Sequence, residues 1–434
     1  MINKIAGYIK SKGTDTYEIF LDSSDNIQVA IQKEKIDFAS EGRMEGLGIR
    51  VSLGKKLGFS STLDINNYQK CVDKAIKIAK LNDEDKKFKK FADTKGKLKK
   101  NLGCDSKLLH FGMNEIKKFV NEYVKNVKEI DEKISLTSGA FVKNVSFTRI
   151  MNSEGLNAEK KTCSNTFWIE MMKEKGNTLG FSYQGRQPLN ANKAKEHTER
   201  FLSTAKKDTA ETKNMKLVIH PEALAELLDE AFSYSINSEN VQAGKSILAG
   251  KIGKKIFNKG ITITDDSTTK GLLCSRPCDD EGIPAKKTVI VSRGVLKNYL
   301  YDTYHANAEG KESTSNAVRS YSSLPEITPS NIIMQKGTKN EEKIISSVDK
   351  CIYVKQLMGV HVMDTTTGDF SLGIIEGHIY EKGEMKHAVK DTMVAGNLYN
   401  MLNNTLALGN KLIHGGRGHY LPLMLCENVK VIGK

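Results

Sequence analysis

The residues that come closest to a catalytic motif lie between positions 218 and 234. Apolar residues at 224, 227, 228, 231 and 232 have helical spacing, and His220 and Pro221 precede them, proline being favoured in a first helical turn. A zinc-binding helix places two ligands on one face, typically His at i and i+4, with a Glu beside the first. Glu230 is present, but Asp229 and Ser233 hold the two ligand positions. Because a serine hydroxyl is a poor zinc ligand, the segment keeps the scaffold of a metalloprotease helix without its chemistry.

Three consecutive acidic residues form a second group with chemical potential. Asp279, Asp280 and Glu281 precede Gly282 and Pro284, and clustered carboxylates can coordinate a hard cation. Successive residues of a strand point to opposite faces, however, which separates neighbouring side chains. We therefore interpret the cluster as a turn that enters a hairpin, with Asp280, Glu281 and Gly282 helping to position a peptide or a partner.

Two further stretches lack the companions that catalysis or metal binding needs. The segment 313–321 is polar and rich in serine, but no His/Asp constellation marks a nucleophile. We expect Asn316 and Arg319 within it to belong to a surface for a peptide or a partner. His414 and His419 flank a glycine-rich loop, and two histidines without a third ligand favour a mobile loop lining a cavity or interface over a metal site. No metal site is predicted in this chain.

The elements that position these residues alternate between helices and strands. Periodic apolar residues predict helices at 2–12, 66–81, 113–130, 191–205 and 241–252, in addition to the helix that begins near 221. Alternating segments between them predict strands, with turn signals at 54, 143–144, 152–155, 293–294 and 382–383. This order predicts an α+β protein built largely from antiparallel strands.

The polar run 206–214 is the strongest domain boundary in the sequence. It separates an N-terminal α/β sandwich-like domain with antiparallel strands, residues 1–205, from a C-terminal domain, residues 215–434. We expect the C-terminal domain to be mixed and mostly antiparallel, with a barrel-like β arrangement, a few helices and the degenerate metalloprotease helix.

Composition narrows the class of protein. The 434 residues include no apolar run long enough to cross a bilayer, and the N-terminus has no signal-peptide hydrophobic region. We therefore expect a cytoplasmic protein without a membrane segment. Its seven cysteines are odd in number and scattered, which favours reduced thiols over a disulfide framework. Cys274 and Cys278 are the one close pair, and no second pair follows to complete a zinc site.

The net charge of +14 raises the question of an acidic partner such as nucleic acid. The excess is almost all lysine, densest between 86 and 100, where acidic residues interleave with it. Arginine, the better reader of bases and phosphates, is scarce there. A solvated linker or helix face is the favoured interpretation, and nucleic-acid binding, which would depend steeply on salt, is disfavoured.

Several stretches, taken together, resemble the TldD/PmbA family, which pairs a zinc-protease subunit, TldD, with a sister subunit, PmbA or TldE. Segments 46–51 and 58–62 are similar to the family's early hairpin, and segments 280–284, 288–291 and 294–296 to its central hairpin. Segments 368–371, 383–384 and 395–398 are similar to its C-terminal block. The similarity covers nearly the whole length in the same order, and the set of segments is specific only when taken together.

The resemblance locates the positions of the family's zinc site. Its catalytic subunits carry His-Glu-x-x-x-His on a helix, one residue longer than the usual spacing, and a cysteine near the C-terminus. On this chain the motif falls on Asp229, Glu230 and Tyr234, and the cysteine position falls within 412–419, where there is no cysteine. Since all three ligand positions are changed, the resemblance is to the PmbA/TldE branch, and no catalytic residue is expected in this chain.

This branch implies a non-catalytic subunit of a cytoplasmic zinc metalloprotease complex that processes unfolded peptides. The chain is expected to hold no cofactor of its own, because a TldD-type partner would supply the zinc and the general base in a heterodimer. The alternative is a homodimeric binding or regulatory protein without proteolytic activity. In either case we expect the chain to be inactive alone.

Overall fold

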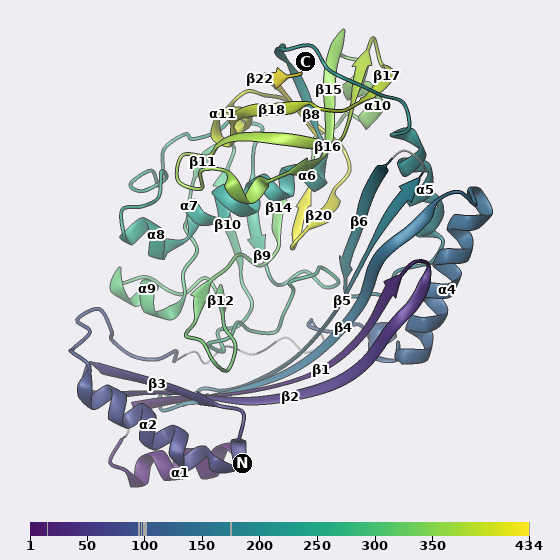
Figure 1. Cartoon of the computed structure of the whole chain (residues 1–434). Helices are drawn as coiled ribbons and strands as arrows, with labels where there is room; N and C mark the ends of the chain where they lie inside the picture. Colours follow the sequence, from purple (N-terminus) through teal and green to yellow (C-terminus); the bar gives the residue numbers. More distant parts are fainter. Residues whose placement is uncertain (15, 94–95, 97, 99–101, 174–175, 434) are drawn as a thin grey trace.

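The N-terminal half is one long, curved antiparallel sheet with helices on its outer side (Figure 1). The structure is a computed structural model that describes all residues except 15, 94–95, 97, 99–101, 174–175 and 434. The sheet has the order β3-β2-β1-β4-β5-β6, with the bounds β1 Thr16–Gln32, β2 Lys35–Leu53, β3 Lys56–Thr62, β4 Ser135–Asn152, β5 Asn157–Lys173 and β6 Asn177–Gly185. Its helices are α1 Ile2–Ser11, α2 Tyr68–Leu81, α3 Ser106–Leu109, α4 Met113–Ile130 and α5 Lys193–Ser203.

Two hydrophobic clusters hold the helices against the outer face of this sheet. Ile19 of β1 and Ile49 of β2 meet the apolar sides of α1 and α2 at one end. At the other end, Phe119 of α4 packs on Phe141 and Phe167, with ring centroids 5.4 and 5.1 Å apart. Each of these helices buries one face only, and none of the helices in the described residues is long and apolar enough to span a membrane.

The C-terminal half contains a closed barrel and a second, mixed sheet. The barrel strands follow each other in the ring β15-β8-β22-β18-β16, and β16 pairs again with β15. The second sheet has the order β11-β10-β9-β14-β21-β20. Apolar side chains from both sheets and the helices between them share one large core.

The bounds of these elements complete the fold. The strands are β7 Lys207–Asp208, β8 Lys213–Ile219, β9 Ile263–Asp266, β10 Lys287–Ser292, β11 Val295–Leu296, β12 Ala317–Val318, β13 Glu326–Ile327, β14 Ile332–Met334, β15 Lys350–Met358, β16 Asp369–Glu381, β17 Glu384–Val389, β18 Met393–Asn397, β19 Thr405–Leu408, β20 Ile413–Gly416, β21 His419–Leu421 and β22 Met424–Ile432. The helices are α6 Pro221–Leu227, α7 Ser233–Ile236, α8 Ser238–Gln242, α9 Thr303–Ala308, α10 Glu341–Ile345 and α11 Leu398–Asn403. Figure 1 shows this half seated on the inner, concave side of the N-terminal sheet.

The α+β class, the antiparallel N-terminal strands and the barrel-like C-terminal half are confirmed. The helices expected at 2–12, 66–81, 113–130 and 191–205 are also present. The turns at Arg293–Gly294 and Lys382–Gly383 have positive φ at both residues. This is the backbone twist that a two-residue hairpin turn requires.

The turn expected at 143–144 is wrong. β4 runs straight through these residues, and Asn144 pairs with Asn26 on one side and Ser164 on the other. The polar side chain of Lys143 is satisfied without a turn, because its buried ammonium donates to the Phe111 carbonyl at 2.9 Å. A polar pair in the middle of a long central strand therefore imitates a turn signal.

The helix expected at 241–252 is also wrong. α8 ends at Gln242, and Gly244 and Gly250 follow with φ values of 71° and 68°. Left-handed backbone of this kind ends a helix. The apolar residues of the stretch, such as Leu248, reach the core from turns instead.

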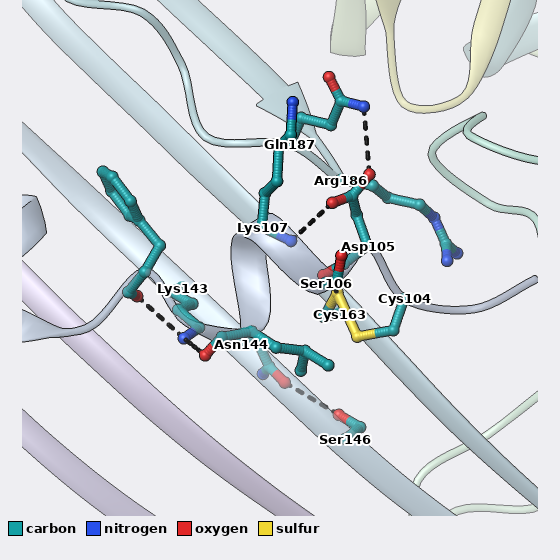
Figure 2. Close-up of a disulfide and its surroundings, with 12 residues drawn as sticks. Cys104, Asp105, Ser106, Lys107, Lys143, Asn144, Ser146, Cys163, Arg186 and Gln187 are labelled. Carbon is teal, nitrogen blue, oxygen red and sulfur yellow. Dashed lines mark hydrogen bonds between the residues drawn. A yellow bond between two sulfur atoms is a disulfide. The ribbon is translucent and has the colours of Figure 1, made fainter. Parts of the chain in front are cut away.

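The cysteines depart from the expectation of reduced thiols. Cys104 and Cys163 form a disulfide that joins the segment before α3 to β5, with Cα atoms 4.9 Å apart (Figure 2). The amide N–H of Cys163 also donates to the Gly103 carbonyl at 2.9 Å. Because 59 residues separate the two cysteines, no local pattern in the sequence indicates this pairing. Free thiols remain at Cys71, Cys274, Cys278, Cys351 and Cys426.

The described part of the lysine-rich stretch is more than a solvated linker. The lysines at 86, 87 and 89 are exposed, but Phe88 and Phe91 are buried. The Asn152 side-chain amide donates to the Ala92 carbonyl at 2.7 Å. The segment is therefore anchored to the turn after β4, while its charges stay in water.

Gly58 tests how closely β3 packs on α2. A Cβ added at Gly58 would lie 2.0 Å from the Ala75 carbonyl oxygen and 2.7 Å from the Ala79 amide nitrogen. Because backbone atoms cannot rotate out of the way, we expect Gly58→Ala to lower the free energy of unfolding by about 1–3 kcal/mol in urea titrations. Gly7→Ala is the control, since Gly7 lies in α1 with open space at its Cβ position and alanine favours a helix by up to about 1 kcal/mol. Equal effects of both changes would contradict this packing.

Candidate functional site

The helix expected to be a degenerate metalloprotease helix begins at a well-defined cap. His220 precedes α6, and its Nδ1 accepts a hydrogen bond from the Glu222 amide N–H at 3.2 Å. Burial lowers the pKa of His220 to about 3, so the ring stays neutral and keeps the lone pair that caps the helix. Pro221 occupies the first helical turn, as the sequence predicts.

A π-turn interrupts this helix at the motif itself. The chain leaves α6 through the π-helix Leu228–Phe232 before entering α7, and the Ser233 amide N–H donates to the Leu228 carbonyl. On a regular α-helix, two residues five positions apart point in different directions. The i→i+5 hydrogen bond of a π-turn widens the turn and so reduces the angle between their side chains. The winding therefore turns Asp229 and Tyr234 closer to a common face, as the longer motif spacing requires.

Asp229 forms an ion pair with Arg417 from the loop between β20 and β21. The Arg417 Nη1 lies 2.6 Å from the Asp229 Oδ2, and this hydrogen bond raises the pKa of the guanidinium. The Arg417 amide N–H donates to the Gln184 Oε1 of β6 at 3.1 Å. The fold thus brings together the helix position and the C-terminal loop, which are 188 residues apart in sequence.

The β20–β21 hairpin approaches α6 closely because it carries glycine at the contact. A Cβ at Gly415 would lie 2.2 Å from the Pro221 carbonyl oxygen and 2.8 Å from the Ala225 Cβ. On the far side of the loop, a Cβ at Gly418 would lie 2.9 Å from the Cys274 Sγ. The loop is packed between these two neighbours.

Burial keeps both histidines of this hairpin neutral at physiological pH. It lowers the pKa of His414 to about 4, and the Nε2 of this ring accepts from the Gly418 N–H at 3.4 Å. The His414 ring also stacks on Tyr420, with centroids 4.8 Å apart. His419 is 1% exposed, its pKa is likewise lowered by burial, and neither ring nitrogen has a hydrogen-bond partner among the described residues.

The side chains at this site do not suit a zinc ion. The Asp229 carboxylate already faces the guanidinium of Arg417, and neither a guanidinium nor the hydroxyl of Tyr234 belongs to the usual donors of zinc. In the part of the chain that the structure describes, no group of three or more His, Cys, Asp or Glu side chains is arranged to hold a metal ion. Glu230 is half-buried beside this pair, without a ligand set around it that would activate a water molecule.

The acidic turn expected to face a peptide or a partner is buried. Asp280 is 7% exposed and forms an ion pair with Lys160 at 2.5 Å. Glu281 is 2% exposed and lies 3.3 Å from the Arg50 guanidinium. Gly282, with φ of 80°, completes the turn and is buried too. In this chain these residues do not form an open surface.

Asn316 and Arg319 are also buried in the chain. The Asn316 side-chain amide donates to the Asp265 Oδ2 at 3.0 Å. The Arg319 guanidinium lies 2.6 Å from the carboxylate of Glu18 on β1. Both side chains are therefore engaged within the fold, and contact of either one with a peptide stays a prediction.

Glu18 joins cations from both halves of the molecule. Its buried carboxylate lies 2.7 Å from Arg50 of β2 and 2.6 Å from Arg319 of the C-terminal half. Burial raises the pKa of Glu18, but the two guanidinium groups more than offset this, and the pKa lies below its ordinary value. Since Arg50 also pairs with Glu281, one buried charge network connects β1 and β2 to the acidic turn.

A cavity of about 540 Å³, which we call the central cavity, lies where these elements meet. Its walls come from β1, β4, β5 and the end of β6 and, in the C-terminal half, from 273–280, 318–319 and 328–329. Gln184, which binds the Arg417 amide, lines it, and so does Cys274, which Gly418 approaches. The central cavity therefore adjoins the helix–hairpin site.

Arg417, Arg186 and Arg276 are functional candidates that sequence reasoning missed. One feature of the sequence indicates Arg417: it stands between Gly416 and Gly418. Glycines of this kind favour a tight turn, in which the side chain between them points outward. Arg186 and Arg276 are 6% and 8% exposed and line the central cavity. Neither lies in a motif, so only the fold reveals them.

Known proteins share both the sequence and the fold of this chain. Residues 212–433 match the family described as the PmbA/TldA metallopeptidase C-terminal domain, and residues 17–79 match PmbA/TldA metallopeptidase domain 1. An uncharacterized protein of Methanocaldococcus jannaschii is 33% identical, with 94% of this chain and 95% of that protein covered. A metalloprotease of the same archaeon is 26% identical, with 89% and 88% covered. The crystal structure of TldE from Thermococcus kodakarensis superposes with a TM-score of 0.92, at 23% identity and 100% coverage of both chains.

Glu18→Gln tests the charge network that joins the two halves. The change leaves two buried guanidinium groups without their shared carboxylate, so we expect the free energy of unfolding to fall by about 3 kcal/mol or more at pH 7. Because the pKa of Glu18 is lower in the folded state, its contribution is present above the unfolded pKa and is lost as the pH falls through the folded pKa. The difference between the two proteins should therefore narrow below about pH 4 in urea titrations.

The matched control is Glu45→Gln, which removes an exposed ion pair with Arg43 on β2. Exposed pairs contribute at most about 1 kcal/mol. Equal losses from Glu18→Gln and Glu45→Gln would contradict a network that holds the halves together.

Proposed function

The chain belongs to the TldD/PmbA family of metallopeptidase-like proteins, and we propose that it is the non-catalytic, PmbA/TldE-type subunit of a peptide-processing complex. In this proposal a TldD-type partner supplies the zinc ion and the glutamate that activates water. The chain contributes a wall that completes the peptide-binding cleft, so that only unfolded peptides enter. The complex is proposed to work in the cytoplasm.

The observation that carries the proposal is the ion pair between Asp229 and Arg417. In the catalytic branch these elements carry the metal ligands, and the metal is the local positive charge. Here a fixed guanidinium takes that place, and its charge repels a divalent cation. The helix–hairpin scaffold is thus retained while an ion pair occupies the position of the metal ligands, which supports a subunit whose partner performs the reaction.

An extended peptide suits the edge of the N-terminal sheet. β6 is the last strand of its sheet, and edge strands offer unpaired backbone groups to an added strand. Gln184 at the end of β6 binds the Arg417 amide, which sets this edge beside the helix–hairpin site. Backbone pairing of this kind would accept many peptide sequences.

We expect the purified chain to cleave no unfolded peptide alone and to support cleavage once a TldD-type sister chain from the same cell is added. The assay follows release of a fluorescent group from an unstructured peptide. In the mixture, Glu230→Gln in this chain should leave the rate within about twofold, because Glu230 activates no water. Replacing the motif glutamate of the sister chain should lower the rate by about a hundredfold or more.

Two results would contradict the proposal. Robust cleavage by the lone chain that Glu230→Gln abolishes would make this chain a catalyst in its own right. Failure to bind the sister chain, together with a stable dimer of this chain in sedimentation analysis, would favour the homodimeric binding protein instead.

A further inference from the structure

The inner wall of the central cavity is polar and partly open to solvent. Ser146 of β4 and Thr162, Ser164 and Thr166 of β5 line it and are half-buried. Phe167, the residue after Thr166 on β5, packs in the core beneath the helices on the outer side. A wall of half-buried hydroxyl groups suits a polar ligand.

Two buried guanidinium groups line the same cavity without carboxylate partners. Arg186 donates from Nε to the Leu273 carbonyl at 2.7 Å and from Nη1 to the Leu102 carbonyl at 3.0 Å, and from Nη2 to the Ser275 carbonyl. Arg276 donates from Nη2 to the Ser315 carbonyl at 3.0 Å. Neither has an ion pair within 4.0 Å among the described residues. Carbonyl groups therefore hold both guanidinium groups in place. The charge of Arg276 also acts on the buried carboxyls of Asp265, Asp279 and Asp280 and works to lower their pKa values, whereas no carboxylate of the described residues acts on Arg186 in this way.

The remaining hydrogen-bonding capacity of these arginines points to a missing acceptor. Arg276 is 8% exposed, and its Nε has no partner in the described part of the chain. A guanidinium group has five N–H donors, and the hydrogen bonds described above use only part of them in either residue. Buried donors of a charged group cost free energy unless an acceptor satisfies them. The Nε of Arg276 is closed off from solvent, so an anionic ligand in the cavity would accept from the Nη groups of these arginines.

The other charges of the cavity define which anion fits. Lys160 and Arg319 are already paired, with Asp280 and Glu18 respectively. Asp22 also lines the cavity, and burial and the neighbouring Asp280 raise its pKa. With these carboxylates nearby, a singly charged carboxylate is better tolerated than a doubly charged phosphate.

The position of Arg186 is fixed by the surrounding covalent and backbone structure. Figure 2 shows Arg186 in the same close-up as the Cys104–Cys163 disulfide. Cys163 lines the cavity with Arg186, and the disulfide holds the segment whose Leu102 carbonyl accepts from the guanidinium. A side chain that is already held in its binding position loses little conformational entropy when a ligand binds.

We propose that the central cavity is a carboxylate-binding site in which Arg186 and Arg276 hold a carboxylate group of a bound peptide. A planar guanidinium matches the two oxygens of a carboxylate. The carboxylate comes either from the C-terminus of the peptide or from an acidic side chain. The peptide nature of the ligand rests on the proposed function, whereas the preference for a carboxylate rests on the cavity alone.

Calorimetry on the lone chain tests this site without any protease partner. The probes are acetylated pentaalanine with a free C-terminal carboxylate, the same peptide amidated, an amidated version with a central glutamate, and inorganic phosphate. We expect at least one carboxylate peptide to bind at least about tenfold more tightly than the amidated pentaalanine. The peptide that binds identifies the source of the carboxylate. Equal binding of the charged and amidated peptides, or tighter binding of phosphate, would overturn the proposal.

Variants then locate the site. We expect Arg276→Gln to remove at least about tenfold of the carboxylate preference, with Arg276→Lys retaining part of it. Arg293→Gln is the control, because Arg293 is exposed in a hairpin turn outside the cavity. Near-ultraviolet circular dichroism shows whether each variant is folded. If a variant does not fold, the comparison of the peptides on the unchanged chain still tests the proposal. Unchanged preference in folded Arg276→Gln would overturn the site. Loss of cleavage in the two-chain assay leaves this binding result unaffected, so the two proposals fail separately.

Discussion

The buried carboxylate of Glu18 is the constraint on which the rest of the structure depends. Removing a carboxylate from water costs several kcal/mol unless cations compensate, and Glu18 meets this requirement with Arg50 from its own sheet and Arg319 from the other half. These ion pairs fix the position of the curved sheet relative to the C-terminal half. Arg319 of this network lines the central cavity, and the helix–hairpin site adjoins that cavity through Gln184.

The helix–hairpin site shows how the fold brings two elements that are distant in sequence into contact. Gly415 allows the hairpin to touch the backbone of α6, and the π-turn adjusts the helix so that residues five apart approach one face. Both features bring ligand positions together. Asp229 and Arg417 then form an ion pair, which keeps the two elements in contact by opposite charges.

Local features of the sequence were sufficient for the long N-terminal helices, the glycine turns and the class of fold, but not for the helix expected at 241–252. Periodicity and turn chemistry act within a few residues, which is why Lys382–Gly383 and the first four long helices could be predicted. Long strands were divided wrongly, because pairing on both sides of β4 overrides a polar pair such as 143–144.

The candidate site could be predicted only in part. The helix and the glycine-rich loop were found from residue types, but the burial of the acidic turn depends on cations far away in the chain. Glu281 is buried because Arg50, 231 residues distant, lies beside it, and Asp280 is buried beside Lys160. The disulfide and the two cavity arginines depend on the same kind of contact. Whether a charge is buried depends on the assembled fold. In the sequence alone, an acidic turn that becomes buried looks the same as one that stays exposed.

Zinc titration of the metal-stripped chain, followed by calorimetry, tests whether the positions of Asp229 and Tyr234 bind zinc. We expect no stoichiometric uptake with a dissociation constant below about 1 µM, whereas a family member with an intact His-Glu-x-x-x-His helix should take up zinc under the same conditions. One equivalent bound tightly by this chain, and lost when Asp229 is replaced by Ala, would contradict this expectation.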